Sequence, residues 1–266
     1  MPEDIDLKAA LTFARKIAKE CGKKLIDYRK NINPSEWKLA TNFKTTADDW
    51  CDNYIRQAIK NKFPTHGIIS EEDEPFDAEN KYLWVVDPLD GTIPYTFKFS
   101  NHYGVAIALV KNNQPLLGVF YAPELDNNGQ AIEYFAMKGK GAYANNKKIK
   151  CVDLDNLNHS FISCDYNKLE RNKILKFTKK LLADDGVGYI TTYACCTAPM
   201  AMVAEGKLHG YFSLKLEPWD MAATSIICRE AGCDVKNIKG ENWTLKDESI
   251  VVTPKKLTKQ FFKKIL

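Results

Sequence analysis

The sequence has few histidines and no cysteines at C-x-x-C spacing, so it offers little for a structural zinc site. It contains four histidines and eight cysteines, and no two of the cysteines form a C-x-x-C pair. Structural zinc sites draw four such ligands from short, recurring spacings. Several cysteines lie in apolar runs, so we expect buried free thiols rather than metal ligands or disulfides.

Long apolar segments and a one-sided charge are also missing. No apolar run approaches the ~18 residues that a membrane-spanning helix needs. The first residues, Met1-Pro2-Glu3-Asp4, lack the apolar core of a secretory signal. The 38 basic residues nearly balance the 34 acidic ones and are not gathered in one arm, which does not favour nucleic-acid binding. We therefore expect a cytoplasmic protein with no membrane and no nucleic acid among its partners.

The first half of the chain is predicted to form two helices followed by short strands. Apolar residues recur at helical spacing over residues 4–30 and about 47–62. Short apolar runs bounded by turn residues follow over 66–137, and Asn145-Asn146 is expected to turn a hairpin. This pattern predicts an N-terminal α+β domain, residues 1–152, built on a largely antiparallel sheet.

The second half is predicted to alternate between strands and helices. Strand-like runs at 161–164, 189–193 and 210–214 are separated by helical patterns, and a further helix is predicted from Pro218 to Ala231. Alternation of this kind indicates a C-terminal α/β domain, residues 153–266.

The segment Asp87-Pro88-Leu89-Asp90-Gly91-Thr92 is the strongest candidate for a functional site. It places two carboxylates and a backbone carbonyl directly after an apolar strand, and hard oxygen ligands of this kind suit magnesium. Pro88 is expected to end the strand, so that Asp87 and Asp90 can face one point. Gly91 and Thr92 open the next element, and the N–H groups of a helix start favour a phosphate. Taken alone, the same string could be only a loop turn.

Two further acidic positions end a strand or begin a helix. Glu71 follows the predicted strand that ends at Ser70, and Asp220 opens a helix after Pro218-Trp219. Each has a simpler explanation when taken alone. Glu71 could belong to a solvated acidic loop, and Asp220 could be a carboxylate that the helix dipole stabilises. Their order along the chain makes a shared site the better interpretation.

That order resembles the inositol monophosphatase family, which consists of magnesium-dependent, lithium-sensitive phosphatases. The resemblance runs over nearly the whole chain, and three motifs in register carry it: Ser70-Glu71-Glu72, Asp87-Pro88-Leu89-Asp90-Gly91-Thr92 and Glu217-Pro218-Trp219-Asp220-Met221-Ala222-Ala223. It implies a layered α/β/α/β/α fold, a homodimer and a small phosphate ester as substrate.

The resemblance also assigns roles to individual residues. Up to three magnesium ions would be held by oxygen ligands of five residues: Glu71, Asp87, Leu89 (through its carbonyl), Asp90 and Asp220. Backbone N–H groups of Gly91 and Thr92 would bind the phosphate. Thr92, hydrogen-bonded to Asp48, would join Glu71 in orienting and deprotonating the attacking water. Paired metals lower the pKa of water and stabilise the leaving alkoxide.

The sequence departs from the family pattern at positions that concern the alcohol more than the phosphate. Asn42 replaces a common Asp, and Pro94 replaces a common Asn. Ser213 stands where inositol-preferring members carry a Glu that contacts ring hydroxyls, and Ala194-Cys195 replaces a Gly-Thr pair that lines the substrate pocket. Substrate contacts are accordingly predicted from five residues: Asp90, Ala194, Cys195, Ser213 and Asp220.

The sequence therefore predicts a magnesium-dependent phosphomonoesterase acting on a small polyol or sugar phosphate, with inositol 1-phosphate as the default. The same chemistry on 3'-phosphoadenosine 5'-phosphate, fructose 1,6-bisphosphate or histidinol phosphate is the nearest alternative, because a lost hydroxyl-binding Glu could redirect substrate choice. A regulatory binding protein on the same fold is the non-enzymatic alternative.

Overall fold

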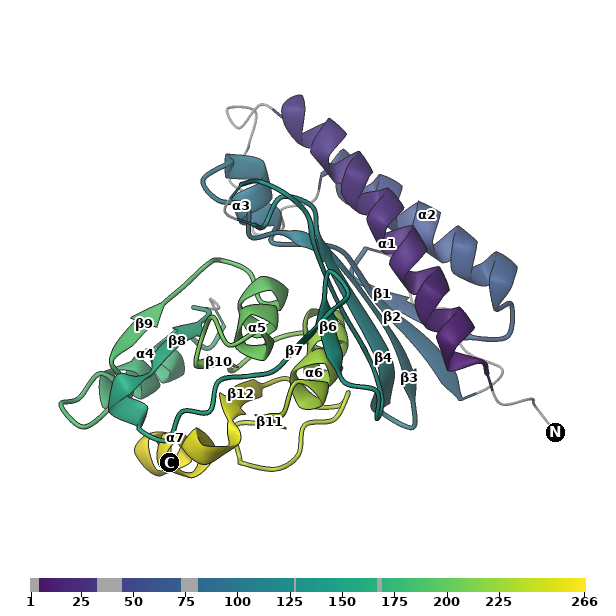
Figure 1. The fold of residues 1–266 in the computed structure, drawn as a ribbon. Helices are drawn as coiled ribbons and strands as arrows, with labels where there is room; N and C mark the ends of the chain where they lie inside the picture. The colour runs from purple at the N-terminus through teal and green to yellow at the C-terminus, as the bar shows by residue number, and fades with distance from the viewer. Residues whose placement is uncertain (1–4, 33–44, 73–80, 127, 167–168) are drawn as a thin grey trace.

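The protein is arranged in five layers, helix–sheet–helix–sheet–helix (Figure 1). The computed structural model describes residues 5–32, 45–72, 81–126, 128–166 and 169–266; Asn42, one of the departures named above, lies outside them. Helices α1 and α2 cover one face of the first sheet, and α5 and α6 lie between the two sheets. Helices α4 and α7 cover the far face of the second sheet. This confirms the predicted layered fold.

The first helical layer follows from amphipathic sequence. Helix α1 (Leu7–Lys30) begins after Asp6, whose carboxylate accepts the N–H groups of Lys8 and Ala9. Its buried residues recur at helical spacing from Ala10 to Leu25, so one stripe faces the sheet. Helix α2 (Thr46–Lys62) lies beside it. Both predicted helices are confirmed.

The first sheet has seven strands in chain order: β1 (Gly67–Ser70), β2 (Tyr82–Asp90), β3 (Gly104–Lys111), β4 (Gln114–Ala122), β5 (Ile132–Met137), β6 (Ala142–Ala144) and β7 (Lys147–Ile149). Strands β1 and β2 are parallel, whereas all the later pairs are antiparallel. The predicted hairpin turns at Asn145 and Asn146, both with positive φ, as such two-residue turns require.

The second sheet has the order β11-β12-β10-β8-β9. Its strands are β8 (Phe161–Cys164), β9 (Tyr189–Thr191), β10 (Gly210–Ser213), β11 (Cys233–Lys236) and β12 (Ile250–Pro254). Strands β9, β8 and β10 run parallel, and β12 is antiparallel to β10. The sequence did not predict β11, because only two apolar residues, Cys233 and Val235, mark its buried face.

The remaining helices are η2 (Leu157–His159, one 3-10 turn), α3 (Thr92–Phe97), α4 (Arg171–Leu181), α5 (Thr197–Ala204), α6 (Pro218–Glu230) and α7 (Lys255–Ile265). None of the described helices combines the length and the apolarity that crossing a membrane would need.

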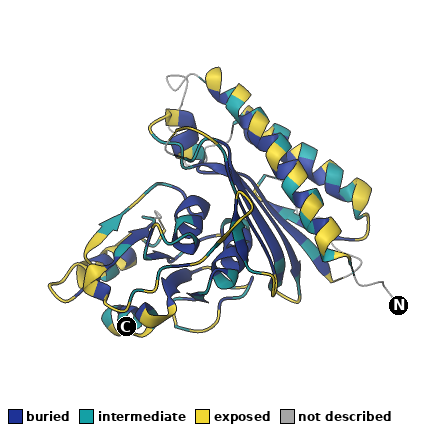
Figure 2. Cartoon of the chain, viewed as in Figure 1, coloured by how far each residue is buried: buried dark blue, intermediate teal, exposed yellow. Residues whose placement is uncertain are grey.

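Helix α6 joins the two halves of the molecule. It packs directly on β4 at Gly118, where an added Cβ would lie 2.3 Å from the carbonyl oxygen of Ala223. Because glycine permits this close approach, residues of both halves share one core, which includes Phe120, Tyr211 and Ile227. Figure 2 shows this continuity as dark blue running from the first sheet through α6 into the second sheet. The layers therefore bring Asp220, on α6, to the first sheet.

Candidate metal and phosphate site

The carboxyl end of β2 is irregular rather than broken. We expected Pro88 to end the strand, but β2 continues to Asp90. Asp87 pairs with Ala106 and Asp90 with Gly104, so the register shifts by one residue between them. An extra residue of this kind is a β-bulge, which turns side chains from their alternating directions. The prediction that Pro88 ends the strand between Asp87 and Asp90 is wrong. The bulge, rather than a strand end, changes the relative direction of the two side chains.

The residues after the bulge form a tight turn into helix α3. The carboxylate of Asp87 accepts the N–H of Leu89 at 3.0 Å, and the hydroxyl of Thr92 donates to the Leu89 carbonyl at 3.1 Å. Gly91 caps α3 with φ of 80°. An added Cβ on Gly91 would lie 2.4 Å from the carbonyl oxygen of His102. Glycine is therefore required here both for its backbone conformation and for space.

Glu71 and Asp220 reach this turn from two other elements. Strands β1 and β2 are parallel with Ser70 opposite Val86, so Glu71 and Asp87 follow at the same end of neighbouring strands. Asp220 is the third residue of α6, and its carboxylate accepts the N–H of Glu217 at 2.8 Å. The helix-start interpretation of Asp220 is thus correct, and it does not compete with a place at the site.

Asp90 is held by the start of helix α5. Its two carboxylate oxygens accept the N–H of Cys196 at 3.2 Å, the thiol of Cys196 at 2.9 Å, the N–H of Thr197 at 3.0 Å and the hydroxyl of Thr197. Ligand-type atoms of Asp90, Cys196 and Asp220 all lie within 4.8 Å of one another. Sequence reasoning missed Cys196 and Thr197. The signal that could have found Thr197 is a hydroxyl residue at the start of an apolar helix.

Burial and mutual repulsion raise the pKa values of these carboxyl groups. Burial, and then the charges of nearby carboxylates, raise the pKa of Glu71 to about 8 and hold that of Asp87 well above its ordinary value. Burial and the charge of Asp90 raise the pKa of Asp220 to about 7. Crowded carboxylates of this kind are the electrostatic arrangement that a bound cation relieves. The donor set therefore fits magnesium.

Asp48 supplies a further buried acceptor. It lies in the first turn of α2, where one carboxylate oxygen accepts the N–H and hydroxyl of Thr45. The other oxygen, Oδ1, is buried without a hydrogen-bond partner among the described residues. Burial raises the pKa of Asp48 to about 7. The predicted hydrogen bond between Thr92 and Asp48 is not formed, because the Thr92 hydroxyl donates to Leu89 instead.

The family of the chain can be decided from its sequence match. The family model described as the inositol monophosphatase family matches residues 6–266. The chain belongs to the inositol monophosphatase family. Its similarity to a fructose-1,6-bisphosphatase/inositol-1-monophosphatase of Aquifex aeolicus is 31% identity over 215 residues, covering 80% of this chain and 78% of the relative. Nus factor SuhB of Xylella fastidiosa is also 31% identical, over 243 residues, covering 88% and 83%.

Solved structures agree with this assignment at the level of the fold. The extragenic suppressor protein suhB from Bartonella henselae superposes with a TM-score of 0.87 at 23% identity, covering 97% of this chain and 98% of that one. Inositol monophosphatase from Anabaena gives a TM-score of 0.84 at 25% identity, covering 98% and 96%. The five-layer arrangement is therefore the fold of inositol monophosphatase and SuhB structures.

Of the residues predicted to contact the alcohol, Ser213 lies at the end of β10, and Ala194 and Cys195 lie just before α5. Ser213 ends β10 and is buried, and its hydroxyl has no partner within the described part of the chain. Ala194 has φ of 54°, an uncommon conformation for a residue with a side chain. The neighbouring Cys195 is buried. Ala194 thus holds a left-handed conformation that glycine, the residue of the family pattern at this position, would adopt without strain.

Asp165 is a candidate site residue that sequence reasoning missed. Strands β8 and β10 are parallel with Cys164 opposite Phe212, so Asp165 and Ser213 emerge at the same sheet edge. Burial, and then the charge of Asp90, raise the pKa of Asp165 to about 6. Asp165 therefore places a carboxylate on the strand next to Ser213. Ser213 itself stands at the position where the family pattern of inositol-preferring members has a Glu.

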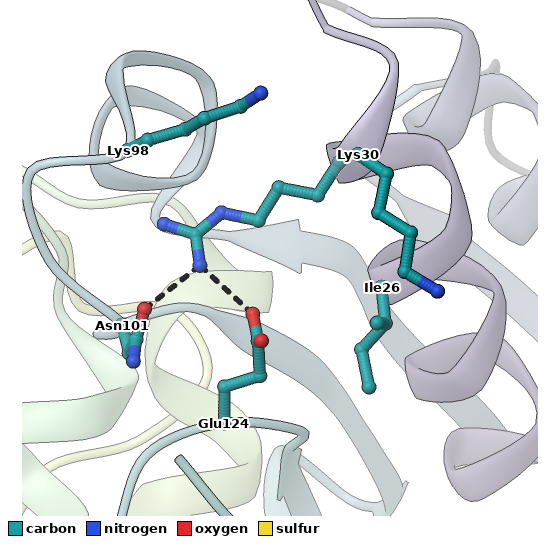
Figure 3. A pocket seen from close by; sticks show the side chains of 6 residues that line it. Ile26, Lys30, Lys98, Asn101 and Glu124 are labelled. Atoms are coloured by element: carbon teal, nitrogen blue, oxygen red, sulfur yellow. Dashed lines mark hydrogen bonds and ion pairs between the residues drawn. The ribbon is translucent and has the colours of Figure 1, made fainter.

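Arg29 of α1 holds helix α3 in place through hydrogen bonds to its backbone carbonyl oxygens. The Arg29 guanidinium donates to the carbonyl oxygens of Tyr95 at 3.1 Å and Pro94 at 3.3 Å, and to side chains of Asn101 and Glu124 at 2.8 Å each. Figure 3 shows the last two bonds in a pocket of about 240 Å³ that Lys30 and Lys98 also line. Helix α3, which begins at Thr92 directly after Gly91, is thereby tied to α1, and Pro94 is buried within it.

Proposed function

We propose that this protein is a magnesium-dependent phosphomonoesterase acting on a small polyol phosphate, with inositol 1-phosphate as its default substrate. The observation that carries the proposal is the convergence of Asp90, on strand β2, with Asp220, on helix α6, beside the turn at Gly91. The relatives named for inositol monophosphatase activity support the same chemistry.

The proposed magnesium ligands are Glu71, Asp87, the Leu89 carbonyl, Asp90 and Asp220. Bound magnesium would supply charge neutralisation for the phosphate and the leaving alkoxide, and would lower the pKa of water. The carboxylates provide negative charge from three elements that the fold holds in place, so the site would be organised before substrate binds.

The remaining residues would orient the reactants. The N–H groups of Gly91 and Thr92 lie at the start of α3, where first-turn N–H groups have no intrahelical carbonyl to bind, and they would bind phosphate oxygens. Glu71 would accept the proton of the attacking water, which the Thr92 hydroxyl would help to orient. Asp48 would receive the Thr92 hydroxyl if that group turned away from Leu89, because Asp48 Oδ1 has no described partner.

A panel of phosphate esters tests the proposal. Phosphate release would be measured for inositol 1-phosphate, fructose 1,6-bisphosphate, 3'-phosphoadenosine 5'-phosphate and histidinol phosphate, with magnesium or with EDTA. We expect release that requires magnesium, and roughly 100-fold or greater loss in Asp90→Asn. Circular dichroism is the control for folding, because the amide nitrogen of that variant cannot accept the hydrogen bonds that Cys196 and Thr197 donate to Asp90. Equal release in EDTA, or full activity of Asp90→Asn, would overturn the proposal.

A binding role is the second candidate, because a relative with 31% identity bears the name Nus factor. Complementation of a strain that lacks this gene separates the two candidates. Wild type and Asp90→Asn would both restore growth if binding alone is required, whereas only wild type would do so if catalysis is required. RNA binding measured by fluorescence anisotropy at low and high salt would test a nucleic-acid partner directly.

The homodimer, lithium inhibition and a cytoplasmic location are further proposals that family membership supports. Light scattering after size exclusion would give the oligomeric state. Phosphate release in rising lithium would test inhibition, and cell fractionation would test the location.

A further inference from the structure

The thiol of Cys196, a soft metal ligand, lies among the carboxylates of Asp90 and Asp220, which are hard ligands. Its sulfur lies 2.9 Å from Asp90 Oδ1, and its N–H donates to the same oxygen at 3.2 Å. The side chain is buried, with only 4% of its surface exposed. Asp220 completes a set of three ligand-type atoms within 4.8 Å of one another. The three residues come from β2, the start of α5 and α6, so the fold itself brings them together.

A thiol contributes little as a ligand for magnesium. Magnesium prefers oxygen ligands and gains little from sulfur. Burial and the charges of Asp90 and Asp220 hold the pKa of the Cys196 thiol well above its ordinary value. The Cys196 thiol donates a hydrogen bond to Asp90 Oδ1.

Zinc and cadmium differ from magnesium in this respect. A thiolate binds zinc at about 2.3 Å and carboxylate oxygens bind it at about 2.0–2.2 Å. Three such ligands around one tetrahedral ion lie roughly 3.5 Å apart, so the three atoms need to move by little more than an ångström to share one ion.

We propose that Cys196, Asp90 and Asp220 form a binding site for a thiophilic divalent cation, such as zinc or cadmium, that overlaps the proposed magnesium site. As the metal–sulfur bond forms, the S–H bond breaks heterolytically and its proton leaves to solvent, without any change in oxidation state. Two of the three ligands are shared with magnesium, so the two kinds of cation compete. Inhibition of phosphate release would follow only if the proposed function holds, whereas binding does not depend on it.

Cadmium titration of the metal-free protein tests the site, because a cadmium–thiolate bond gives a charge-transfer absorption band that oxygen ligands do not. Wild type should bind one ion with this band, and added magnesium should displace it. Cys196→Ser keeps a hydroxyl to donate to Asp90; we expect it to lose the band and to bind cadmium roughly tenfold or more weakly. Its affinity for magnesium, measured by calorimetry, should stay within about twofold of wild type.

Cys195→Ser is the matched control, since it removes the adjacent buried thiol and should bind cadmium as wild type does. An unchanged band in Cys196→Ser overturns the proposal, because the other buried cysteines would then be the ligands. If Cys196→Ser does not fold, the competition experiment on wild type decides: cadmium that magnesium cannot displace also overturns it. None of these experiments measures phosphatase activity, so a failure of the proposed function would not change their results.

Discussion

Arg29 on α1 and Glu124, just beyond β4, form an ion pair of 2.8 Å across the pocket behind helix α3. The same guanidinium binds the carbonyl oxygens of Pro94, Tyr95 and Ser100, so it ties the segment that follows Gly91 to the first helical layer. Because Arg29 is buried, its removal would leave Glu124 and several carbonyl groups without a partner.

We expect Arg29→Ala to lower the free energy of unfolding by about 3–5 kcal/mol and to reduce phosphate release, since α3 would lose its anchor. Glu124→Gln keeps a polar partner and should cost about 1–3 kcal/mol. Urea unfolding measures both. Lys256→Ala is the control, because its pair with Asp153 is exposed on both sides and should contribute little to stability. Equal stability of Arg29→Ala and Lys256→Ala would show that the anchor has no effect.

Gly91→Ala should destabilise the protein by more than the cost of placing alanine in a left-handed backbone conformation. Its φ is 80°, and the new Cβ would lie 2.4 Å from the carbonyl oxygen of His102. Gly129 has φ of 70° with nothing within 4 Å of the same built atom. Both substitutions should cost about 1–2 kcal/mol for the conformation, and Gly91→Ala roughly 1–3 kcal/mol more for the clash. Denaturant unfolding of the two variants gives the difference; equal costs would contradict the close approach.

Stability of the metal-free protein should fall as the pH rises from mildly acidic to mildly alkaline. The folded-state pKa values of Asp48 and Asp220 are about 7 and that of Glu71 is about 8, against ordinary values of 3.8 and 4.5. Groups with raised pKa values bind protons in the folded state that the unfolded state has released. Their stabilising effect is therefore complete below about pH 4 and is lost as the pH rises through about 7–8.

Melting temperatures of EDTA-treated protein between about pH 5 and pH 8 measure this effect. Magnesium should reduce the fall, because a cation offsets the repulsion among the ionised carboxylates. Asp220→Asn should flatten the curve in EDTA, since one of the titrating groups is gone. A melting temperature that rises over this range in EDTA would show that the carboxylates are not crowded as described.

The sequence predicted the acidic residues at strand ends and at a helix start better than the contacts between distant elements. Glu71, Asp87 and Asp220 were identified because a strand end or helix start is a local pattern. The contact of Cys196 with Asp90 joins residues 106 positions apart, and it depends on how α5 packs between the sheets. The bulge after Asp87 was missed for a related reason, since only pairing with β3 defines it.

Asp165 provides the last prediction, which concerns substrate choice. It emerges beside Ser213 at the edge shared by β8 and β10, close enough to Asp90 for that charge to raise its pKa. Asp165 is outside the proposed magnesium ligands, and we expect its carboxylate to accept hydrogen bonds from hydroxyl groups of the alcohol. A site that binds hydroxyls through a buried carboxylate discriminates against substrates that lack them.

We expect Asp165→Asn to raise KM for polyol phosphates roughly tenfold while kcat changes by less than about threefold, because contacts to the alcohol are made equally before and during the reaction. For a phosphate ester without vicinal hydroxyls, KM should change little. Asp153→Asn, which alters an exposed carboxylate on the same half of the chain, is the control for a general charge effect. If kcat falls and KM is unchanged for every ester, Asp165 acts on the reacting phosphate rather than on the alcohol.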